Sequence, residues 1–262
     1  EKVGPAQIAM HKIHTVRHPR IPASAHDKQG RDVLASIARR DDKYLKAFDG
    51  RVLQGLTDEH FIELELGKLD NPQRIMLFLT GWVFPTDTSL NVAISQNPNI
   101  DPPRPPFIQV PNGKGGWREA IPYTGFPGGK TKTIAIDISD IFPTDDYRLR
   151  LTTSMQLCWD QIFFTVDEKP EEVESTELPL IAADLHFRGF NRRVEHPGNG
   201  PESYDYNQVD TNPKWPPMAG RFTRYGDVAA LLRTEDDQLV VMGSGDEMTI
   251  RFRAPDKPLP SG

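Results

Sequence analysis

Short stretches of alternating or continuous apolar residues fill the middle of the chain and predict β-strands. Residues 60–66, 131–138 and 147–151 alternate apolar and polar side chains, which places alternate side chains on opposite faces of a strand. Residues 74–82 form a nearly continuous apolar run, which is typical of a buried strand. We therefore expect Ile134, Ile136, Ile138, Leu149 and Leu151 to face one apolar core. Further strands are expected at 90–95, 117–121, 161–166, 178–190 and 247–252.

A helix is expected over residues 32–48, near the start of the chain. Val33, Ile37, Tyr44 and Phe48 recur at spacings of four and seven residues, which gathers them on one side of a helix. The residues before position 30 are polar and show no clear period, so we expect an extended arm there. A short helix is also expected at 227–233.

The proline content favours a chain of short strands joined by long loops. The 262 residues include 24 prolines and 20 glycines, and proline is excluded from the interior of long helices and central strands. We expect a mainly β fold: a β-sandwich of the jelly-roll or galactose-binding-like type, with one N-terminal helix and a second β-rich segment. The expected divisions are arm and helix 1–59, sandwich 60–167, acidic linker 168–177 and second segment 178–262.

Charge and cysteine content exclude several classes of function. The formal net charge is -6, which disfavours nucleic-acid binding because that needs a concentrated basic face. No apolar run approaches the roughly 20 residues of a membrane-spanning helix. Cys158 is the single cysteine, so an intrachain disulfide, a cysteine-rich zinc site and an iron–sulfur cluster are excluded. We expect its thiol to serve as a small apolar filler.

Tryptophan side chains offer one candidate ligand site. Trp82, Trp117 and Trp159 could stack on the apolar face of a sugar, while Asp160 and Gln161 bind its hydroxyl groups. The alternative is that the indoles fill the core and that Asp160 accepts hydrogen bonds at a strand start. We favour the alternative, because large aromatic side chains are mostly buried.

A second candidate lies in the expected strand 178–190, where Asp184, His186 and Arg188 share one face. An acid, an imidazole and a guanidinium could bind an anion or act as acid and base. An ion-pair ladder on a partly exposed strand explains the same pattern, and we favour it. The glycine-rich stretch 243–247 precedes a strand rather than a helix, so it predicts a turn and not a phosphate loop. No catalytic set is expected.

Metal binding is indicated only weakly. The loop carboxylates of Asp140, Asp145, Asp146, Asp205 and Asp210 leave a structural calcium ion open, although no segment has the ligand alternation of a calcium loop. The spacing of the N-terminal histidines suits neither a helix face nor a strand face, so we favour a solvated arm. No cofactor is expected.

Several short motifs, taken in order, resemble one known family. They lie at 78–82, 116–118, 125–130, 159–162, 183–190 and 223–228, and the stretch 22–48 resembles the entry to the same region. Together they resemble the C-terminal region of bacterial FG-GAP/ASPIC-UnbV proteins, the cartilage-acidic-protein-like family. The resemblance implies an exported protein, periplasmic, at the cell surface or secreted, and a binding or adhesive role. The family's propeller and its calcium loops have no counterpart here, and its pattern continues past Gly262, so we expect an incomplete second segment.

These observations favour a non-catalytic binding or structural module that engages carbohydrate or another protein. An accessory or hydrolytic enzyme domain that uses Asp160 and Asp184 is the first alternative. It requires two or three acids and a base in one cleft. The second alternative is a subunit of a larger extracellular assembly, in which a partner buries Tyr204, Tyr206 and Trp215.

Overall fold

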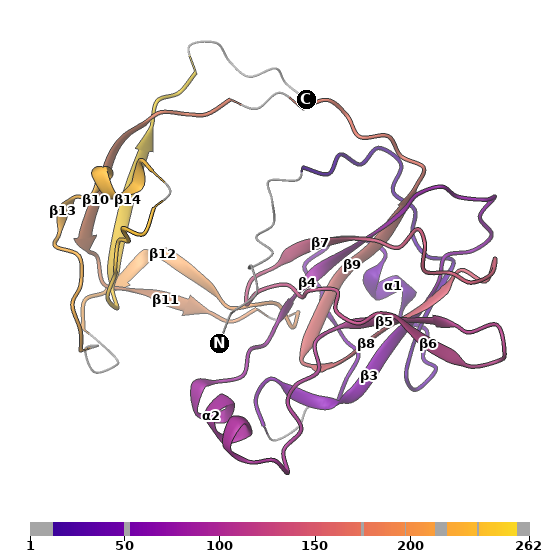
Figure 1. Ribbon diagram of the computed structural model, residues 1–262. Helices are drawn as coiled ribbons and strands as arrows, with labels where there is room; N and C mark the ends of the chain where they lie inside the picture. The colour runs from indigo at the N-terminus through magenta and orange to yellow at the C-terminus, as the bar shows by residue number, and fades with distance from the viewer. Residues whose placement is uncertain are drawn as a thin grey trace. The chain divides into compact units, whose positions relative to one another are not determined.

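The protein is mainly β, which confirms the expected fold class. The structure is a computed structural model and describes residues 13–49, 53–173, 176–196, 198–212, 219–234 and 236–255 (Figure 1). The chain divides into two compact units. The first, the sandwich unit, contains the chain up to Glu172 together with Glu195–Glu202, and the second unit contains Val173–Val194 and the chain from Ser203. The first crossing between them falls inside the expected linker 168–177.

Two antiparallel sheets form the sandwich unit. The five-stranded sheet has the order β1 (Ser24–Asp27), β3 (Leu56–Glu65), β8 (Arg148–Met155), β5 (Phe107–Pro111) and β6 (Trp117–Ile121). The four-stranded sheet has the order β2 (Leu45–Lys46), β9 (Leu157–Val166), β4 (Ile75–Val83) and β7 (Lys132–Asp137). Neighbouring strands pair antiparallel throughout.

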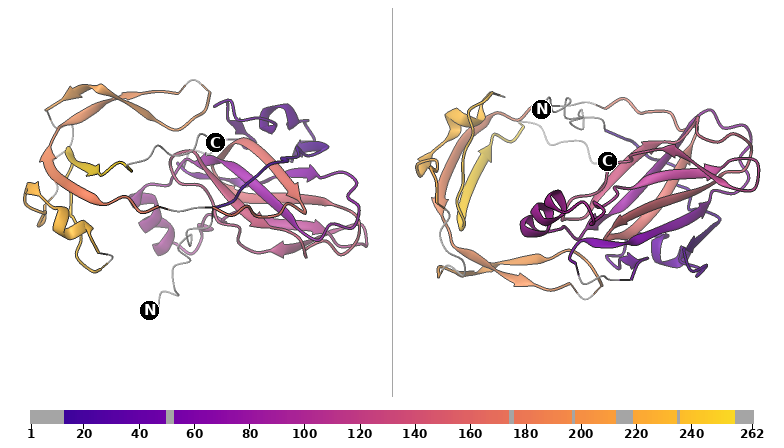
Figure 2. Two further views of the ribbon diagram at one scale, coloured as in Figure 1. Left: turned by 90° about the horizontal axis from the view of Figure 1, so that it is seen from above. Right: turned by 60° about the horizontal axis from the view of Figure 1, so that its bottom comes forward.

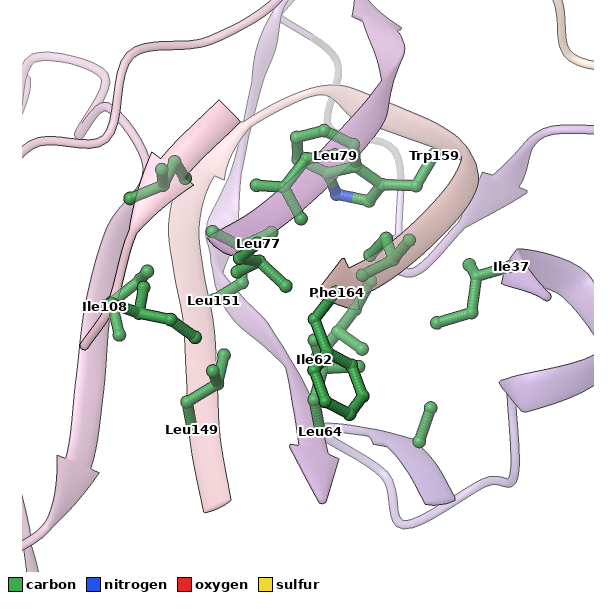
Figure 3. Packing of buried hydrophobic residues seen from close by; sticks show 14 of the residues in the cluster. Ile37, Ile62, Leu64, Leu77, Leu79, Ile108, Leu149, Leu151, Trp159 and Phe164 are labelled. Carbon is green, nitrogen blue, oxygen red and sulfur yellow. The ribbon is translucent and has the colours of Figure 1, made fainter. Parts of the chain in front are cut away.

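Aliphatic and aromatic side chains from both sheets pack into one core (Figure 3). Leu77 and Leu79 of β4 and Phe164 of β9 face Ile62 and Leu64 of β3, and all five are almost completely buried. The side chains expected to face one core do so: Ile136, Ile138, Leu149 and Leu151 are buried, and Ile134 packs against them. The alternation of apolar and polar residues in these strands therefore predicted correctly which side chains are buried.

The helix expected over 32–48 is wrong. Only α1 (Leu34–Ile37) is helical, and the chain then turns and forms β2 at the edge of β9. Ile37 lies in the core, whereas Tyr44 and Phe48 lie in a separate apolar cluster. One face of a helix cannot contact both clusters. Tertiary packing therefore determines the conformation here, and not the helical spacing of the apolar residues.

The strand expected at 90–95 is also wrong, because these residues belong to α2 (Thr88–Gln96). Asp87 caps this helix: its carboxylate accepts a hydrogen bond from the Leu90 amide at 2.7 Å. None of the α2 side chains is buried. Apolar periodicity reports a buried face, so it carries no information about a helix that is exposed all round.

The second unit contains one small sheet and one ribbon. The sheet has the order β13 (Gly226–Asp227), β10 (Leu180–Phe187) and β14 (Asp246–Phe252), with the 3₁₀ helix η1 (Ala229–Leu232) beside β10. Strands β11 (Phe190–Val194) and β12 (Ser203–Asp210) form the two-stranded ribbon seen in Figure 2. The expected strand 247–252 is confirmed, and the short helix expected at 227–233 is present as the 3₁₀ helix η1 over 229–232. Strand β12 was not expected from the sequence.

Candidate functional site

The three tryptophans of the candidate sugar platform lie in three different surroundings. Trp159 is buried in the sandwich core. Trp82 is buried on the opposite face of the four-stranded sheet, where its indole N–H donates to the carbonyl of Asn199 at 2.8 Å. Trp117 lies on β6 of the other sheet, with the Arg150 guanidinium 4.0 Å from its ring centroid. These indoles do not share a surface, so the structure does not assemble a platform from all three.

The surroundings of Trp82 form a compact group, which we call the outer cluster: Tyr44, Phe48, Trp82 and Cys158. A cavity of about 270 Å³ lies beside it. Its lining is Lys46, Phe48, Trp82, Phe84, Gln156, Cys158, Asn199 and Gly200. Burial raises the pKa of the Cys158 thiol to about 11, so this thiol stays protonated at neutral pH. The cysteine therefore acts as the small apolar filler that was expected.

Asp160 lies at a β-bulge in β9. Thr80 of β4 pairs with Gln161 and the next residue, Gly81, pairs with Trp159, so Asp160 is the additional residue. Its side chain is fully buried, and Oδ1 accepts a hydrogen bond from the Asp41 amide at 3.0 Å. Within the described residues, Oδ2 has no hydrogen-bond partner. The bulge thus directs a carboxylate to the turn that precedes β2, which is a structural role. Gln161 stays half-buried on the same strand.

Burial raises the pKa of Asp160 above its ordinary value. The backbone N–H groups of Asp41 and Asp42 oppose this rise, whereas the carboxylates of the same two residues add to it. A raised folded-state pKa means that the protonated form favours folding. The resulting stabilisation is complete below the unfolded pKa of about 3.9 and is lost as pH rises through the folded pKa. At neutral pH the charge on Asp160 therefore lowers stability.

We expect Asp160→Asn to leave the protein at least as stable as the wild type at pH 7. The amide keeps an oxygen for the Asp41 N–H and removes the buried charge. The advantage of the variant should shrink as pH falls toward 4, because the wild-type carboxyl then becomes neutral. Urea midpoints at pH 7, 5.5 and 4 measure this. Asp160→Ala serves as the control, since it leaves the Asp41 N–H without an acceptor and should cost about 1–3 kcal/mol. An Asn variant that is weaker than the wild type by the same amount at all three pH values would contradict the account.

The second sequence candidate does come together on the second unit. Asp184, His186 and Arg188 lie along one face of β10 and beyond it, and Glu247 of β14 joins them. His186 Nδ1 lies 3.0 Å from Asp184 Oδ2, and His186 Nε2 lies 3.4 Å from Glu247 Oε1. Arg188 pairs with the other oxygen of Glu247 and also donates to the carbonyl of Tyr206. We call these four residues the polar face.

The polar face has the features of an ion-pair ladder. Its charged groups are paired with one another in an alternating row, and the Asp184 side chain is 62% exposed. Water therefore reaches the row, which weakens each pair and screens any charge that a reaction would develop. Three of the four residues could be placed on this face from the sequence. The fourth, Glu247, joins them through the register of β10 with β14.

A third site, which the sequence reasoning missed, is a hollow of about 450 Å³ in the second unit. We call it the aromatic hollow. Its lining is Phe187, Phe222, Thr223, Arg224, Tyr225, Gly243, Ser244 and Asp246. Phe187, Phe222 and Tyr225 are each between 40% and 52% exposed. Three aromatic side chains thus line one concavity and remain accessible to a ligand.

A tight turn shapes one wall of the aromatic hollow. Gly245 has a φ of +86°, and a Cβ there would lie 2.6 Å from the Phe187 ring, so only glycine fits. The Asp246 carboxylate accepts hydrogen bonds from the Tyr225 hydroxyl and from the Gly243 amide at 2.6 Å. The hydrogen bond to Asp246 raises the pKa of Tyr225. The sequence stretch 243–247 is therefore a turn, as expected, and it also fixes an aromatic wall.

No sequence period could have indicated the hollow. Phe187 ends a strand, while Phe222 and Tyr225 come from a segment without regular structure. The sequence feature nearest to the hollow is local: Arg224 and Tyr225 lie between Gly220 and the short strand β13.

The structure gives little indication of metal binding. Within the described ranges, no group of three or more His, Cys, Asp or Glu side chains is arranged to hold a metal ion. His14 packs edge-on against Phe78, with ring centroids 5.9 Å apart, and His11 lies outside the described residues. None of the helices in the described part of the chain has the length and apolar character that crossing a membrane would need.

Comparison with known proteins adds no assignment: no family model, no curated protein and no solved structure matches the chain. The resemblance to FG-GAP/ASPIC-UnbV proteins therefore stays a prediction from the sequence.

Proposed function

We propose that the protein is a non-catalytic carbohydrate-binding module, in which the sandwich unit is the scaffold and the aromatic hollow is the binding site. The observation that carries the proposal is the concentration of exposed aromatic side chains on the second unit. They are Phe187, Tyr204, Tyr206, Phe222, Tyr225 and Phe252, whereas the much larger sandwich unit exposes Phe84, Tyr123 and Phe126. Three of the six line one hollow.

The contrast between the two cores supports this division of roles. The sandwich unit has an extensive buried core, while the core that the described residues of the second unit form consists of Ala183, Leu185, Val228 and Ala229 with partly buried neighbours. Exposed aromatic rings in a concavity offer apolar faces to the C–H faces of a sugar. The Tyr225 hydroxyl and the backbone of the turn supply polar groups at the rim.

An enzymatic role has weaker support. Asp160 is fully buried and bound to the Asp41 amide, so it does not reach a substrate. Asp184 lies with His186 on an exposed strand face, where water is not excluded. The described residues thus offer a histidine between two carboxylates but no enclosed cleft around it.

We expect Phe222→Ala to weaken saccharide binding by about tenfold, because the loss of one stacking face removes roughly 1.4 kcal/mol. The test is a glycan array probed with the full chain, followed by titration calorimetry with the strongest saccharide. Phe252→Ala is the matched control, since Phe252 lies in the same unit, is 54% exposed and is not part of the hollow's lining. Absence of binding to any saccharide, or equal losses in both variants, would refute the proposal.

A protein partner is the second candidate, and the open edges of the second unit favour it. Among the residues that the structure describes, β14 is the last strand of its sheet, and β11 and β12 form a ribbon of two strands. Such ribbons are marginally stable alone, and unpaired strand edges can accept a further strand. If the protein assembles with itself in this way, light scattering at micromolar concentration should give a mass above that of one chain. A strictly monomeric mass would count against self-assembly.

We also propose that the protein works outside the cytoplasm. This part of the proposal depends on the family resemblance alone, and fractionation of the source cells tests it.

A further inference from the structure

The aromatic hollow contains one charged side chain, Arg224, that forms no ion pair within the described residues. Arg224 lines the hollow and is exposed, and it makes no ion pair or hydrogen bond within the described residues. The other charged lining residue is Asp246, and both of its oxygens already accept hydrogen bonds, from Tyr225 and Gly243. The Arg224 guanidinium therefore keeps its N–H donors for a ligand, whereas the Asp246 carboxylate is already engaged in holding the wall of the hollow.

The guanidinium of Arg224 indicates which chemical group a ligand of this hollow should carry. It presents five N–H donors in a planar fork that matches the two oxygens of a carboxylate. The nearby rings of Phe187, Phe222 and Tyr225 suit an apolar ring face rather than a compact inorganic anion. A ligand that satisfies both requirements carries a carboxylate on a saccharide ring, as a hexuronate does.

We propose that the aromatic hollow selects acidic saccharides that contain hexuronate, with Arg224 binding the carboxylate and the three rings binding the sugar. This inference rests on the proposed carbohydrate binding and adds the ligand class and the residue that determines specificity. Arg224 faces water in the free protein, so binding does not require an existing ion pair to break.

The experiment compares each hexuronate oligosaccharide with its methyl ester, which keeps the ring and removes the charge. The wild-type chain should bind the free acid at least tenfold more tightly than the ester, because a hydrogen bond to a charged group adds this much discrimination. Arg224→Gln should reduce the preference to near unity, because the free acid loses its charged hydrogen-bond donor and with it the advantage over the ester. Arg221→Gln is the control, since Arg221 is a nearby exposed arginine that does not line the hollow. Circular dichroism checks that each variant is folded.

The outcomes separate this inference from the function on which it rests. A free-acid preference that Arg224→Gln removes and Arg221→Gln retains supports it. Equal binding of acids and esters, or a preference that survives in Arg224→Gln, overturns the acidic-ligand inference and leaves carbohydrate binding in place. Failure of every acidic and neutral saccharide to bind overturns both.

Discussion

Phe164→Ala should lower the free energy of unfolding of the sandwich unit by about 3–5 kcal/mol. Phe164 is 1% exposed and lies between the two sheets, among the side chains of β3 and β4 (Figure 3). The substitution loses the transfer free energy of the phenyl ring and leaves a cavity that two hydrogen-bonded sheets cannot close. Urea denaturation followed by circular dichroism measures the loss.

Phe126→Ala is the matched control for this core substitution. Phe126 belongs to the same unit but is 38% exposed, so the same change should cost little. Similar midpoints for the two variants would show that the core does not lie between the two sheets.

Gly81→Ala should destabilise the protein by about 1–3 kcal/mol through overpacking. A Cβ at this position would lie 2.4 Å from the carbonyl oxygen of Cys158 and 2.8 Å from the Trp159 ring. The nearest atom belongs to the backbone of β9 at the bulge, so a side-chain rotation cannot relieve the overlap. The strands must separate locally, and the bulge that positions Asp160 would be disturbed with them.

Gly129→Ala is the control for the glycine substitution, because nothing lies within 4 Å of a Cβ there. It should be neutral or slightly stabilising, since alanine reduces the freedom of the unfolded chain. Equal stabilities of the Gly81 and Gly129 variants would contradict the pairing of β4 with β9 described above.

The sequence predicted those parts of the fold in which burial alternates along a strand. Ile136 and Leu149 follow such alternation, and both lie in the core. The segment around Tyr44 could not be predicted, because its conformation depends on the distant Asp160 carboxylate and on pairing with Cys158 and Trp159. Helix α2 was missed because it has no buried face. Long-range contacts and full exposure both remove the local period on which such predictions rely.

The candidate sites also differ in how far the sequence could predict them. Asp184 and His186 share a face because they lie two residues apart on one strand, which the sequence shows directly. The position of Trp82 could not be foreseen, since its indole is tied to Asn199, more than a hundred residues later. The aromatic hollow combines a strand end, an irregular segment and a turn, so only the folded chain brings Phe187 and Tyr225 together.

The central claim is that the second unit binds the ligand while the sandwich unit supports it. A titration of the ¹⁵N-labelled full chain with the strongest saccharide from the array, followed by amide chemical shifts, tests it most directly. We expect the perturbed amides to cluster at residues 187, 222–225 and 243–246, with the amides of β4 and β9 unchanged. Perturbations concentrated around Trp82 and the outer cluster, with none at the aromatic hollow, would contradict the account.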